Sequence, residues 1–242
     1  MPRWIHERKN EHYYLKAKEE GYRSRATYKL KQLSSEFGFF IGAHKILDLG
    51  AAPGGWLQVA SEALHGEGLV LGVDLKEIEP FEAVNVETIV GDATSSEIQE
   101  EVLSKLNGRA DVILSDMAPN VTGIWDLDDL RQINLARTAL KIADKLLEEE
   151  GWMVVKVFQG PHHEAFIDDM KAFFKRVYII KPKASRKRSA EVYLVAKGIR
   201  EDSRLPVEEE QEAPPEEEKP LPGENLPDYG EPKEYKPNKS NL

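Results

Sequence analysis

Apolar and polar residues alternate along this chain in a pattern that predicts strands separated by helices. Short runs of Val, Ile and Leu are followed by longer segments in which apolar residues recur every three or four positions. The pattern predicts strands over Lys45–Leu49, Leu69–Asp74, Val86–Val90, Val112–Ser115, Met153–Phe158, Arg176–Ile180 and Val192–Ala196. It predicts helices over Arg25–Phe37, Gly55–Leu64, Ser95–Leu106, Asp128–Glu149 and His163–Phe174.

The order of these elements indicates an α/β fold built on a mainly parallel, Rossmann-like sheet. Helices alternate with the earlier strands, whereas only residues 181–190 separate the last two, so that this pair can be antiparallel. A seven-stranded mixed sheet with an antiparallel last strand is the layout of methyltransferases. It differs from the sheet of a full dinucleotide-binding dehydrogenase.

The absence of cysteine narrows the chemistry. None of the 242 residues is Cys, which excludes a disulfide framework, a thiolate zinc site and a cysteine nucleophile. The first ten residues lack the apolar stretch of a secretory signal, and no run approaches the roughly 20 apolar residues of a membrane span. The six histidines lack the spacing of metal ligands. We therefore expect a soluble, cytoplasmic protein with no membrane partner and no metal.

The net charge of −10 conceals a partition along the chain. Residues 1–31 carry nine Lys and Arg against four Asp and Glu, and residues 181–200 carry seven against one. Between them, residues 32–180 hold 12 basic and 25 acidic side chains. A basic face is therefore compatible with the acidic total, and we expect the segment 1–31 to bind RNA.

The composition changes near Glu201. Eight of the 14 prolines lie in residues 201–242, together with two runs of three glutamates. Such a segment buries too little apolar surface to offset its ordering entropy. We expect one domain over residues 1–200 and a disordered acidic tail over residues 201–242.

A glycine-rich turn follows the first strand. Gly50, Gly54 and Gly55 in the run 48–56 let the backbone approach a ligand without interference from a Cβ atom. The spacing is not G-x-G-x-x-G, and no Lys-Ser/Thr follows Gly55, so a ligand without a pyrophosphate is favoured. A tight turn with no ligand is an equally good interpretation of these glycines alone.

Two acids at strand ends narrow the choice of ligand. Asp74 ends the second strand and Asp92 follows the third, at the carboxyl ends where ligands of open α/β sheets bind. A carboxylate at Asp74 suits the two hydroxyls of a ribose, and one at Asp92 suits the exocyclic amine of adenine. Either acid alone fits a helix cap or a loop. Together with the glycines they make S-adenosylmethionine the leading ligand.

Lys156 lies inside the apolar run 153–158, where an ammonium is costly unless a carboxylate pairs with it. Asp116 and Glu191 are the candidate partners, and a lysine that snorkels to water is the alternative. The segment 116–120 lacks the Asp/Asn-Pro-Pro-aromatic element of amino methyltransferases, and the absence of Cys removes the covalent route to pyrimidine carbon-5. A hydroxyl is therefore the expected methyl acceptor.

Several runs of the chain resemble the FtsJ/RlmE-type RNA 2′-O-methyltransferases, which act on the ribose of large-subunit (23S) ribosomal RNA. The resemblance spans residues 3–197 and rests on residues 24–30, 48–56, 115–120, 154–160, 181–186 and 191–193. It implies a catalytic set that falls on Lys29, Asp116, Lys156 and Glu191. The cofactor contacts that it implies fall on Gly54, Trp56, Asp74, Asp92 and Asp116. It also implies S-adenosylmethionine as cofactor and ribosomal RNA within a large-subunit particle as partner.

The resemblance implies that a ribose 2′-hydroxyl, which we expect to belong to a uridine, attacks the sulfonium methyl in line without a metal. Lys156 is then either the base that accepts the hydroxyl proton or a charged group that steers the hydroxyl while water takes the proton. Asp116 and Glu191 orient it. Both roles predict that Lys156→Ala abolishes methyl transfer and leaves cofactor binding nearly intact.

Basic residues of the N-terminal segment are interleaved with aromatic ones, a mixture suited to phosphate contacts and to stacking on bases. They are Arg3, Arg8, Lys9, Lys16, Lys18, Arg23, Arg25 and Lys31, with Trp4, Tyr13, Tyr14, Tyr22 and Tyr28. A second basic cluster, at Lys181, Lys183, Arg186, Lys187 and Arg188, is expected on the same face. Trp125 and Trp152 are expected to be packing residues.

Other functions stay open from the sequence alone. The substrate could be transfer RNA or a messenger cap, or the chain could be a noncatalytic RNA-binding module gated by the cofactor. The complete set of Lys29, Asp116, Lys156 and Glu191 disfavours the module. The missing dinucleotide fingerprint disfavours a nicotinamide oxidoreductase. We expect a monomer.

Overall fold

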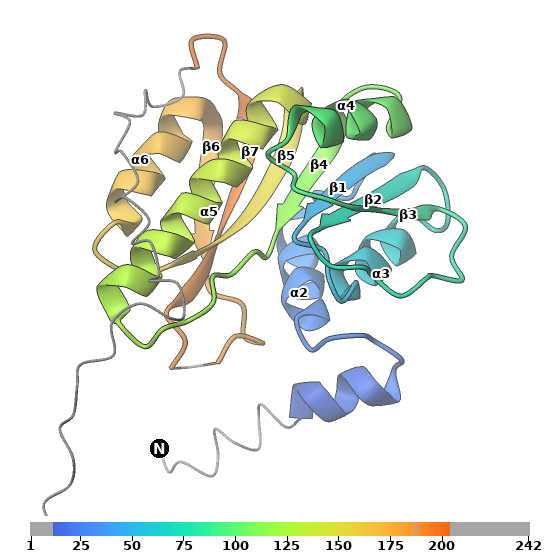
Figure 1. Cartoon of the computed structure of the whole chain (residues 1–242), viewed down its shortest axis with the longest axis horizontal. Coiled ribbons are helices and arrows are strands. Elements are labelled where there is room, and N and C mark those ends of the chain that lie inside the picture. Colours follow the sequence, from blue (N-terminus) through green and yellow to red (C-terminus); the bar gives the residue numbers. More distant parts are fainter. Residues whose placement is uncertain (1–11, 187, 204–242) are drawn as a thin grey trace, which may run out of the picture. The chain divides into compact units, whose positions relative to one another are not determined.

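The computed structural model describes residues 12–186 and 188–203, which form a seven-stranded sheet with helices on both faces (Figure 1). The strand order is β3-β2-β1-β4-β5-β7-β6. The first five strands pair in parallel, and β7 is antiparallel to both β5 and β6, which confirms the predicted fold class. The strands are β1 (Lys45–Leu49), β2 (Leu69–Asp74), β3 (Val86–Val90), β4 (Ala110–Ser115), β5 (Leu147–Phe158), β6 (Phe174–Ile180) and β7 (Glu191–Ile199).

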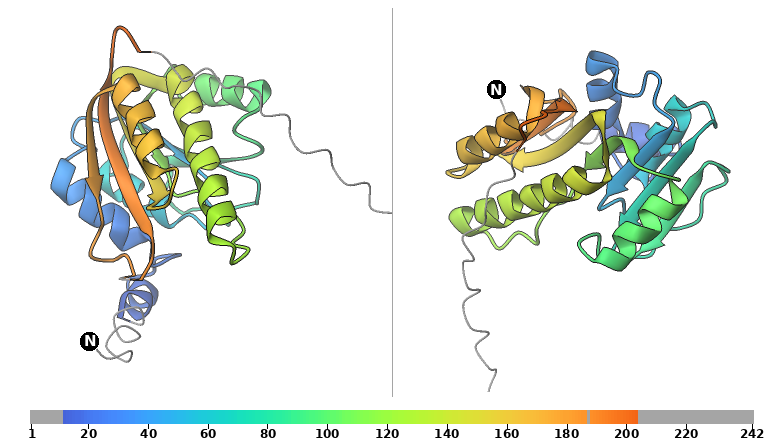
Figure 2. Two further views of the ribbon diagram at one scale, coloured as in Figure 1. Left: turned by 90° about the vertical axis from the view of Figure 1, so that its left-hand side faces the viewer. Right: turned by 90° about the horizontal axis from the view of Figure 1, so that it is seen from above.

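Five helices divide between the two faces of the sheet (Figure 2). One core cluster packs α2 (Thr27–Phe37) and α3 (Gly55–Ala63) on one face, through side chains such as Leu30 and Leu57. The other cluster packs α4 (Ser96–Lys105), α5 (Trp125–Leu146) and α6 (His163–Phe173) on the opposite face, through side chains such as Ile133 and Phe166. The apolar stripes of the helices therefore cover both surfaces of the sheet.

The structure contains a further helical segment, over residues 12–19, that the sequence pattern does not predict. It is short and mostly polar, and its buried Ala17 packs with Tyr28 and Ala184 in a small apolar cluster. A segment with one buried position in two turns carries little periodic signal. Residues 204–242 of the predicted tail, like the first 11 residues of the chain, lie outside the described residues.

The largest error in the predicted boundaries lies between α5 and β5. The pattern predicts helix to Glu149, whereas α5 ends at Leu146 and β5 begins at Leu147. Leu147 pairs with Ala110 of β4, and Trp152 pairs with Val112 and with Lys197 of β7. Glutamates 148–150 favour a helix by propensity, but tertiary strand pairing overrides that preference.

The sheet brings residues from five strands to one edge. The carboxyl ends of parallel β1, β2, β4 and β5 lie there, and so does the beginning of antiparallel β7. Ser115 pairs with Val155, so that Asp116 follows directly beside Lys156, and Lys156 pairs with Tyr193. In the part of the chain that the structure describes, no helix is long and apolar enough to cross a membrane.

Candidate active site

The glycine loop after β1 turns tightly against its neighbours. Gly50 and Gly54 have φ values of 73° and 104°, a region that favours glycine. A Cβ atom on Gly50 would lie 2.5 Å from Met117 Cγ, and one on Gly54 would lie 2.5 Å from Phe81 Cζ. A Cβ on Gly55 would lie 2.5 Å from Ser24 Oγ. Gly50 and Gly54 therefore require glycine, and all three glycines let the loop pack closely against its neighbours.

The two strand-end acids lie where the sequence predicts them. Asp74 Oδ2 accepts a hydrogen bond of 2.9 Å from the Ala52 amide of the glycine loop, and Oδ1 accepts one of 2.9 Å from the Lys76 amide. Asp92 Oδ1 accepts bonds from the amide and the hydroxyl of Thr94, which lower the pKa of Asp92. Each carboxylate offers about four lone-pair sites, so both retain acceptor capacity for a ligand.

Asp48 is a buried acid in β1 that the sequence analysis did not select. Its side chain is 1% exposed, and its Oδ2 has no hydrogen-bond partner among the described residues. Burial, together with the charges of Asp116 and Asp74, raises the pKa of Asp48 well above its usual value. Its position as the one acid in the apolar run 46–49 is the signal that marks it.

Lys156 is paired with Asp116, one of its two predicted partners. The Lys156 ammonium lies 3.0 Å from Asp116 Oδ1 and donates a 2.6 Å hydrogen bond to the Asp116 carbonyl oxygen. The two side chains are 7% and 21% exposed. Their strands are adjacent and in register, so the backbone holds this pair in place. The alternative of a lysine that snorkels to water is wrong.

A second ion pair joins Lys29 of α2 to Glu191 of β7. Lys29 Nζ lies 2.7 Å from Glu191 Oε1. Tyr193 connects the two pairs, because its hydroxyl donates to Asp116 Oδ1 at 2.7 Å and accepts from Lys29 Nζ at 3.2 Å. The four predicted catalytic residues and Tyr193 therefore form one hydrogen-bonded chain. The sequence analysis quoted Tyr193 only as part of a run and gave it no role.

The pKa shifts fit this chain of contacts. Burial raises the pKa of Asp116, but the positive charges of Lys156 and Lys29 and the Tyr193 hydrogen bond more than offset it, so the net pKa is lowered. Burial and the nearby Asp116 carboxylate raise the pKa of Tyr193 well above its usual value. Asp116 is therefore an acceptor and Tyr193 a donor over the whole neutral range.

Trp56 supports this arrangement from the first turn of α3. Its side chain is 4% exposed, its indole N–H donates 3.0 Å to the Ala26 carbonyl, and its ring packs against Tyr193 at 5.8 Å between centroids. The indole therefore positions the start of α2 and the tyrosine. Any contact of Trp56 with a cofactor would come from its backbone amide at the start of the helix.

Comparisons with known proteins place this site in a family. The model of the FtsJ-like methyltransferases matches residues 22–199, which include the glycine loop and all five members of the hydrogen-bonded chain. The chain belongs to the FtsJ-like methyltransferase family. The resemblance noted from the sequence is thereby confirmed.

Relatives of this FtsJ-like methyltransferase cover most of its length. A protein of Methanothrix thermoacetophila named ribosomal RNA large subunit methyltransferase E is 51% identical over 187 residues, which are 77% of this chain and 72% of the relative. The protein of the same name from Methanobrevibacter smithii is 48% identical over 193 residues, 80% of this chain and 92% of the relative.

Solved structures have the same fold. A Plasmodium falciparum protein described as a ribosomal RNA methyltransferase superposes with a TM-score of 0.67 at 29% identity, over 76% of this chain and all of that one. Human methyltransferase-like protein 13, solved with S-adenosylhomocysteine, superposes with a TM-score of 0.50 at 12% identity, over 74% of this chain and 82% of that one. The fold is that of the S-adenosylmethionine-dependent methyltransferases.

The two basic segments of the FtsJ-like methyltransferase meet on one face. The Ala184 amide donates a 3.1 Å hydrogen bond to Gln32 Oε1, which ties the β6–β7 connection to α2. A groove of about 980 Å³ lies between them, and its basic lining residues are Lys16, Lys31, Lys181 and Lys183. Arg186 lies near Arg25. Burial of Arg25 and repulsion from the Arg186 charge both lower the pKa of Arg25.

Two residues assigned to RNA contact from the sequence are engaged inside the protein. Tyr28 is 5% exposed and its hydroxyl donates 2.9 Å to Glu20, so its ring cannot stack on a base. The Arg23 guanidinium donates to the carbonyls of Glu79 and Pro80, each at 2.6 Å, and covers the Phe81 ring at 3.7 Å. Arg23 thus fixes the loop after β2 against the glycine loop.

The expectation for Trp125 is wrong. Its side chain is 45% exposed at the first position of α5. Trp152 packs against the core cluster of α2 and α3, as expected. No group of three or more His, Asp or Glu side chains that could hold a metal ion occurs within residues 12–186 and 188–203.

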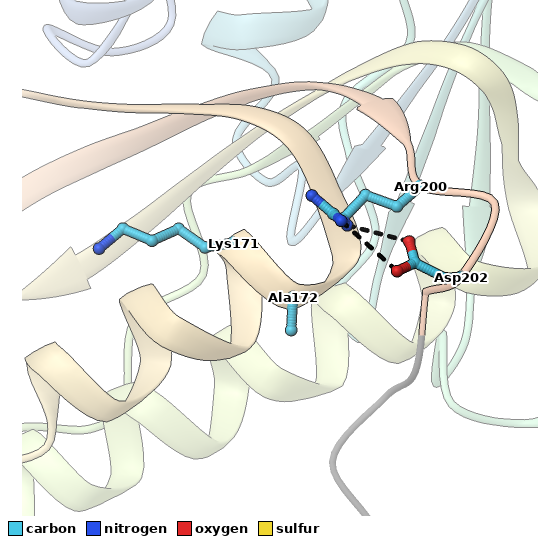
Figure 3. A pocket seen from close by; sticks show the side chains of 4 residues that line it. All are labelled: Lys171, Ala172, Arg200 and Asp202. Atoms are coloured by element: carbon cyan, nitrogen blue, oxygen red, sulfur yellow. Dashed lines mark hydrogen bonds and ion pairs between the residues drawn. The ribbon is translucent and has the colours of Figure 1, made fainter.

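A separate hollow lies away from this site, lined by Lys171, Ala172, Arg200 and Asp202 (Figure 3). Arg200 follows the end of β7, and an antiparallel strand that starts at the catalytic edge must end at the opposite one. Arg200 is bonded to Asp202 through two contacts of 3.1 and 3.5 Å. The hollow therefore takes no part in the chemistry at the other edge.

Proposed function

We propose that this FtsJ-like methyltransferase transfers a methyl group from S-adenosylmethionine to a ribose 2′-hydroxyl of large-subunit ribosomal RNA. The observation that carries the proposal is the hydrogen-bonded chain Lys156–Asp116–Tyr193–Lys29–Glu191, next to the glycine loop. Two ammonium groups and two carboxylates in one connected chain suit a weakly acidic hydroxyl that must be oriented and then lose its proton.

The residues at the ends of β1, β2 and β3 fit the cofactor. Asp48 offers a buried carboxyl oxygen without a partner among the described residues, and the loop at Gly50 and Gly54 has no room for a Cβ atom. Asp74 would hold the ribose hydroxyls and Asp92 the adenine amine. Bound there, the cofactor supplies an electrophilic methyl group on a sulfonium.

Lys156 acts in this proposal as the steering group. Its ammonium has three N–H donors, and Asp116 engages two of them through its carboxylate and carbonyl oxygens. The third can donate to the ribose hydroxyl oxygen and turn a lone pair toward the methyl group. The new O–CH₃ bond forms as the S–CH₃ bond breaks, and the hydroxyl proton leaves to water.

The basic surfaces favour RNA as the substrate. The groove between the segment 12–36 and residues 180–183 is lined by four lysines, Lys16, Lys31, Lys181 and Lys183, against two acids, Glu20 and Glu36. Two arginines, Arg25 and Arg186, lie together near Glu191. Clustered cations of this kind attract the phosphate backbone. The names of the relatives specify ribosomal RNA of the large subunit, and we propose the same substrate here, with a uridine as target.

The test is a map of ribose methylation in total RNA from cells with and without the gene. We expect the loss of one 2′-O-methyl group, at a uridine of large-subunit ribosomal RNA, and its restoration by the wild-type gene but not by Lys156→Ala. The purified variant should transfer methyl groups at least about 100-fold more slowly and bind the cofactor with unchanged affinity in calorimetry. Loss confined to transfer RNA would contradict the proposed substrate, and normal turnover of Lys156→Ala would contradict the mechanism.

Lys156→Arg separates the two roles of the lysine. An arginine stays protonated and cannot act as a base, but it can still donate hydrogen bonds. Activity of Lys156→Arg clearly above that of Lys156→Ala is the expected result. Equal loss in both variants would favour proton transfer to the lysine.

A further inference from the structure

An exposed aromatic pair lies at the end of β5, outside the chain of catalytic contacts. The rings of Trp125 and Phe158 are stacked, with 6.1 Å between centroids and 18° between planes. Phe158 is half-buried and Trp125 is 45% exposed, so the pair presents a supported indole to solvent. Val121 and Ile124, at 69% and 62% exposed, extend this apolar surface.

The aromatic pair is adjacent to the proposed acceptor site. Phe158 follows Lys156 by two residues on β5, so the two side chains leave the same face of the strand, roughly 7 Å apart along it. In a nucleotide the base is attached to ribose carbon 1′, next to carbon 2′, which carries the hydroxyl. When that hydroxyl contacts Lys156, the base of the same nucleotide lies within a few ångströms of Lys156. This distance is comparable to the spacing between Lys156 and Phe158. The cofactor residues lie at β1–β3, on the other side of β4.

The support beneath Trp125 is rigid. Asp128, 3% exposed, accepts hydrogen bonds from the amide and hydroxyl of Thr122, both at 2.8 Å, and from the Gly123 amide at 3.0 Å. These bonds fix the loop that leads into α5 and hence the position of Trp125. A ring that is already ordered loses little entropy when a ligand stacks on it.

The charges around the platform favour a base over a phosphate. The first turns of α5 carry Asp126, Asp128 and Asp129, which repel an anion. The cations that attract phosphate, such as Arg25 and Arg186, belong to the segment before α2 and the β6–β7 connection. This polarity would orient a nucleotide with its backbone toward the arginines and its base toward Trp125.

We propose that Trp125, backed by Phe158, is the stacking platform for the base of the target nucleotide. The proposal rests on the proposed function, since it takes the 2′-hydroxyl at Lys156 as its reference point. Stacking on an aromatic ring tolerates any base and contributes to affinity without reading sequence. Trp125 is thus a substrate-positioning residue that turns the ribose, through its base, toward the cofactor.

The test compares full-length wild type, Trp125→Ala and Trp125→Phe on two RNA fragments that contain the mapped nucleotide. One fragment is intact, and in the other the target base is replaced by hydrogen, which leaves the ribose hydroxyl in place. We expect Trp125→Ala to weaken binding of the intact fragment roughly tenfold and Trp125→Phe to retain most of the affinity. Removal of the base should cost the wild type a similar factor and Trp125→Ala almost nothing.

Val84→Ala is the control. Val84 is 95% exposed and lies just before β3, at the edge of the sheet opposite the site, so its substitution should leave RNA binding unchanged. Thermal unfolding and cofactor affinity verify that Trp125→Ala is folded. The proposal is overturned if Trp125→Ala loses the same factor on both fragments, loses nothing, or instead breaks a dimer in sedimentation. A wild type that methylates no RNA would refute the proposed function itself.

Discussion

Tyr193 makes the two ion pairs of the site interdependent. Its hydroxyl is fully buried, donates to Asp116 and accepts from Lys29. Movement of either lysine therefore disturbs the carboxylate of the other pair. A lone lysine in an apolar strand predicted from sequence that Lys156 has a carboxylate partner, with Asp116 and Glu191 as the candidates. No comparable signal exists for Tyr193, because an aromatic residue in a buried strand is ordinary and only the β5–β7 register places it beside Lys156.

Tyr193→Phe should slow methyl transfer with little change in cofactor binding. Phenylalanine keeps the packing against Trp56 and loses both hydrogen bonds, each of them to a charged group, which contribute about 1.5–3 kcal/mol. We expect kcat to fall roughly tenfold, with the cofactor dissociation constant unchanged, when both are measured on the purified variant. An unaltered kcat would mean that the two ion pairs act independently.

Asp48 should give the fold a specific pH dependence. Because burial and two neighbouring carboxylates raise its pKa well above 3.8, the folded state holds a proton that the unfolded chain releases near pH 4. Its stabilising contribution is therefore complete below about pH 4 and is lost as pH rises through the folded pKa. Asparagine at position 48 cannot titrate. The free energy of unfolding of Asp48→Asn, relative to that of the wild type, should therefore increase as pH rises.

Urea unfolding at pH 5, 6.5 and 8 measures this difference. Asp128→Asn is a control whose titration lies at lower pH, because hydrogen bonds from Thr122 and Gly123 lower the pKa of Asp128. Asp128 is ionised in both the folded and the unfolded state above about pH 5, so the difference in unfolding free energy between this variant and the wild type should stay constant over the three pH values. Parallel curves for wild type and Asp48→Asn would show that the Asp48 carboxyl titrates normally.

The first turns of α5 hold both loops that flank the catalytic pair. Asp128 bonds the loop before the helix, Asp129 bonds the amide and ring nitrogen of His162, and Gln132 donates to the carbonyls of Met117 and Lys156. The sequence predicted a helix here and placed its start at Asp128. It could not show that three polar residues on this helix turn inward, because an acidic first turn is also typical of a solvated helix end.

Gly160→Ala should disrupt this element. A Cβ atom at Gly160 would lie 2.1 Å from Asp129 Oδ1, and Asp129 is fully buried, so the loop or the helix must move. We expect a fall in melting temperature of several degrees and a lower kcat. Adding Asp129→Ala to Gly160→Ala removes the clash, so the two effects on the unfolding free energy should be less than additive. Additive losses of unfolding free energy would show that the effect of Gly160→Ala does not come from the contact with Asp129.

At the scale of the whole molecule, the alternation of apolar runs and helices predicted the sheet because the central runs are apolar enough to be buried on both faces. The same pattern placed Asp74, Asp92, Asp116 and Lys156 at one edge, since parallel strands share their carboxyl ends. Residues whose roles depend on surface shape were harder to predict from the sequence. Nothing in the local sequence distinguishes the exposed Trp125 from the half-buried Trp152.

The distribution of charge over the whole surface determines how RNA binds to this acidic protein. The net charge is −10, yet Lys16, Lys31, Lys181 and Lys183 line one groove, so the local field and not the total governs binding. Arg186→Ala combined with Arg188→Ala should weaken RNA binding and reduce the slope of log Kd against log salt by roughly 1–2, one for each lost phosphate contact. Fluorescence anisotropy with a labelled RNA fragment, at salt concentrations from about 50 to about 200 mM, measures this slope. Lys171→Ala, a change of charge at the opposite edge of the sheet, should leave the slope unchanged. An equal slope for the double variant and the wild type would place the RNA path away from the β6–β7 connection.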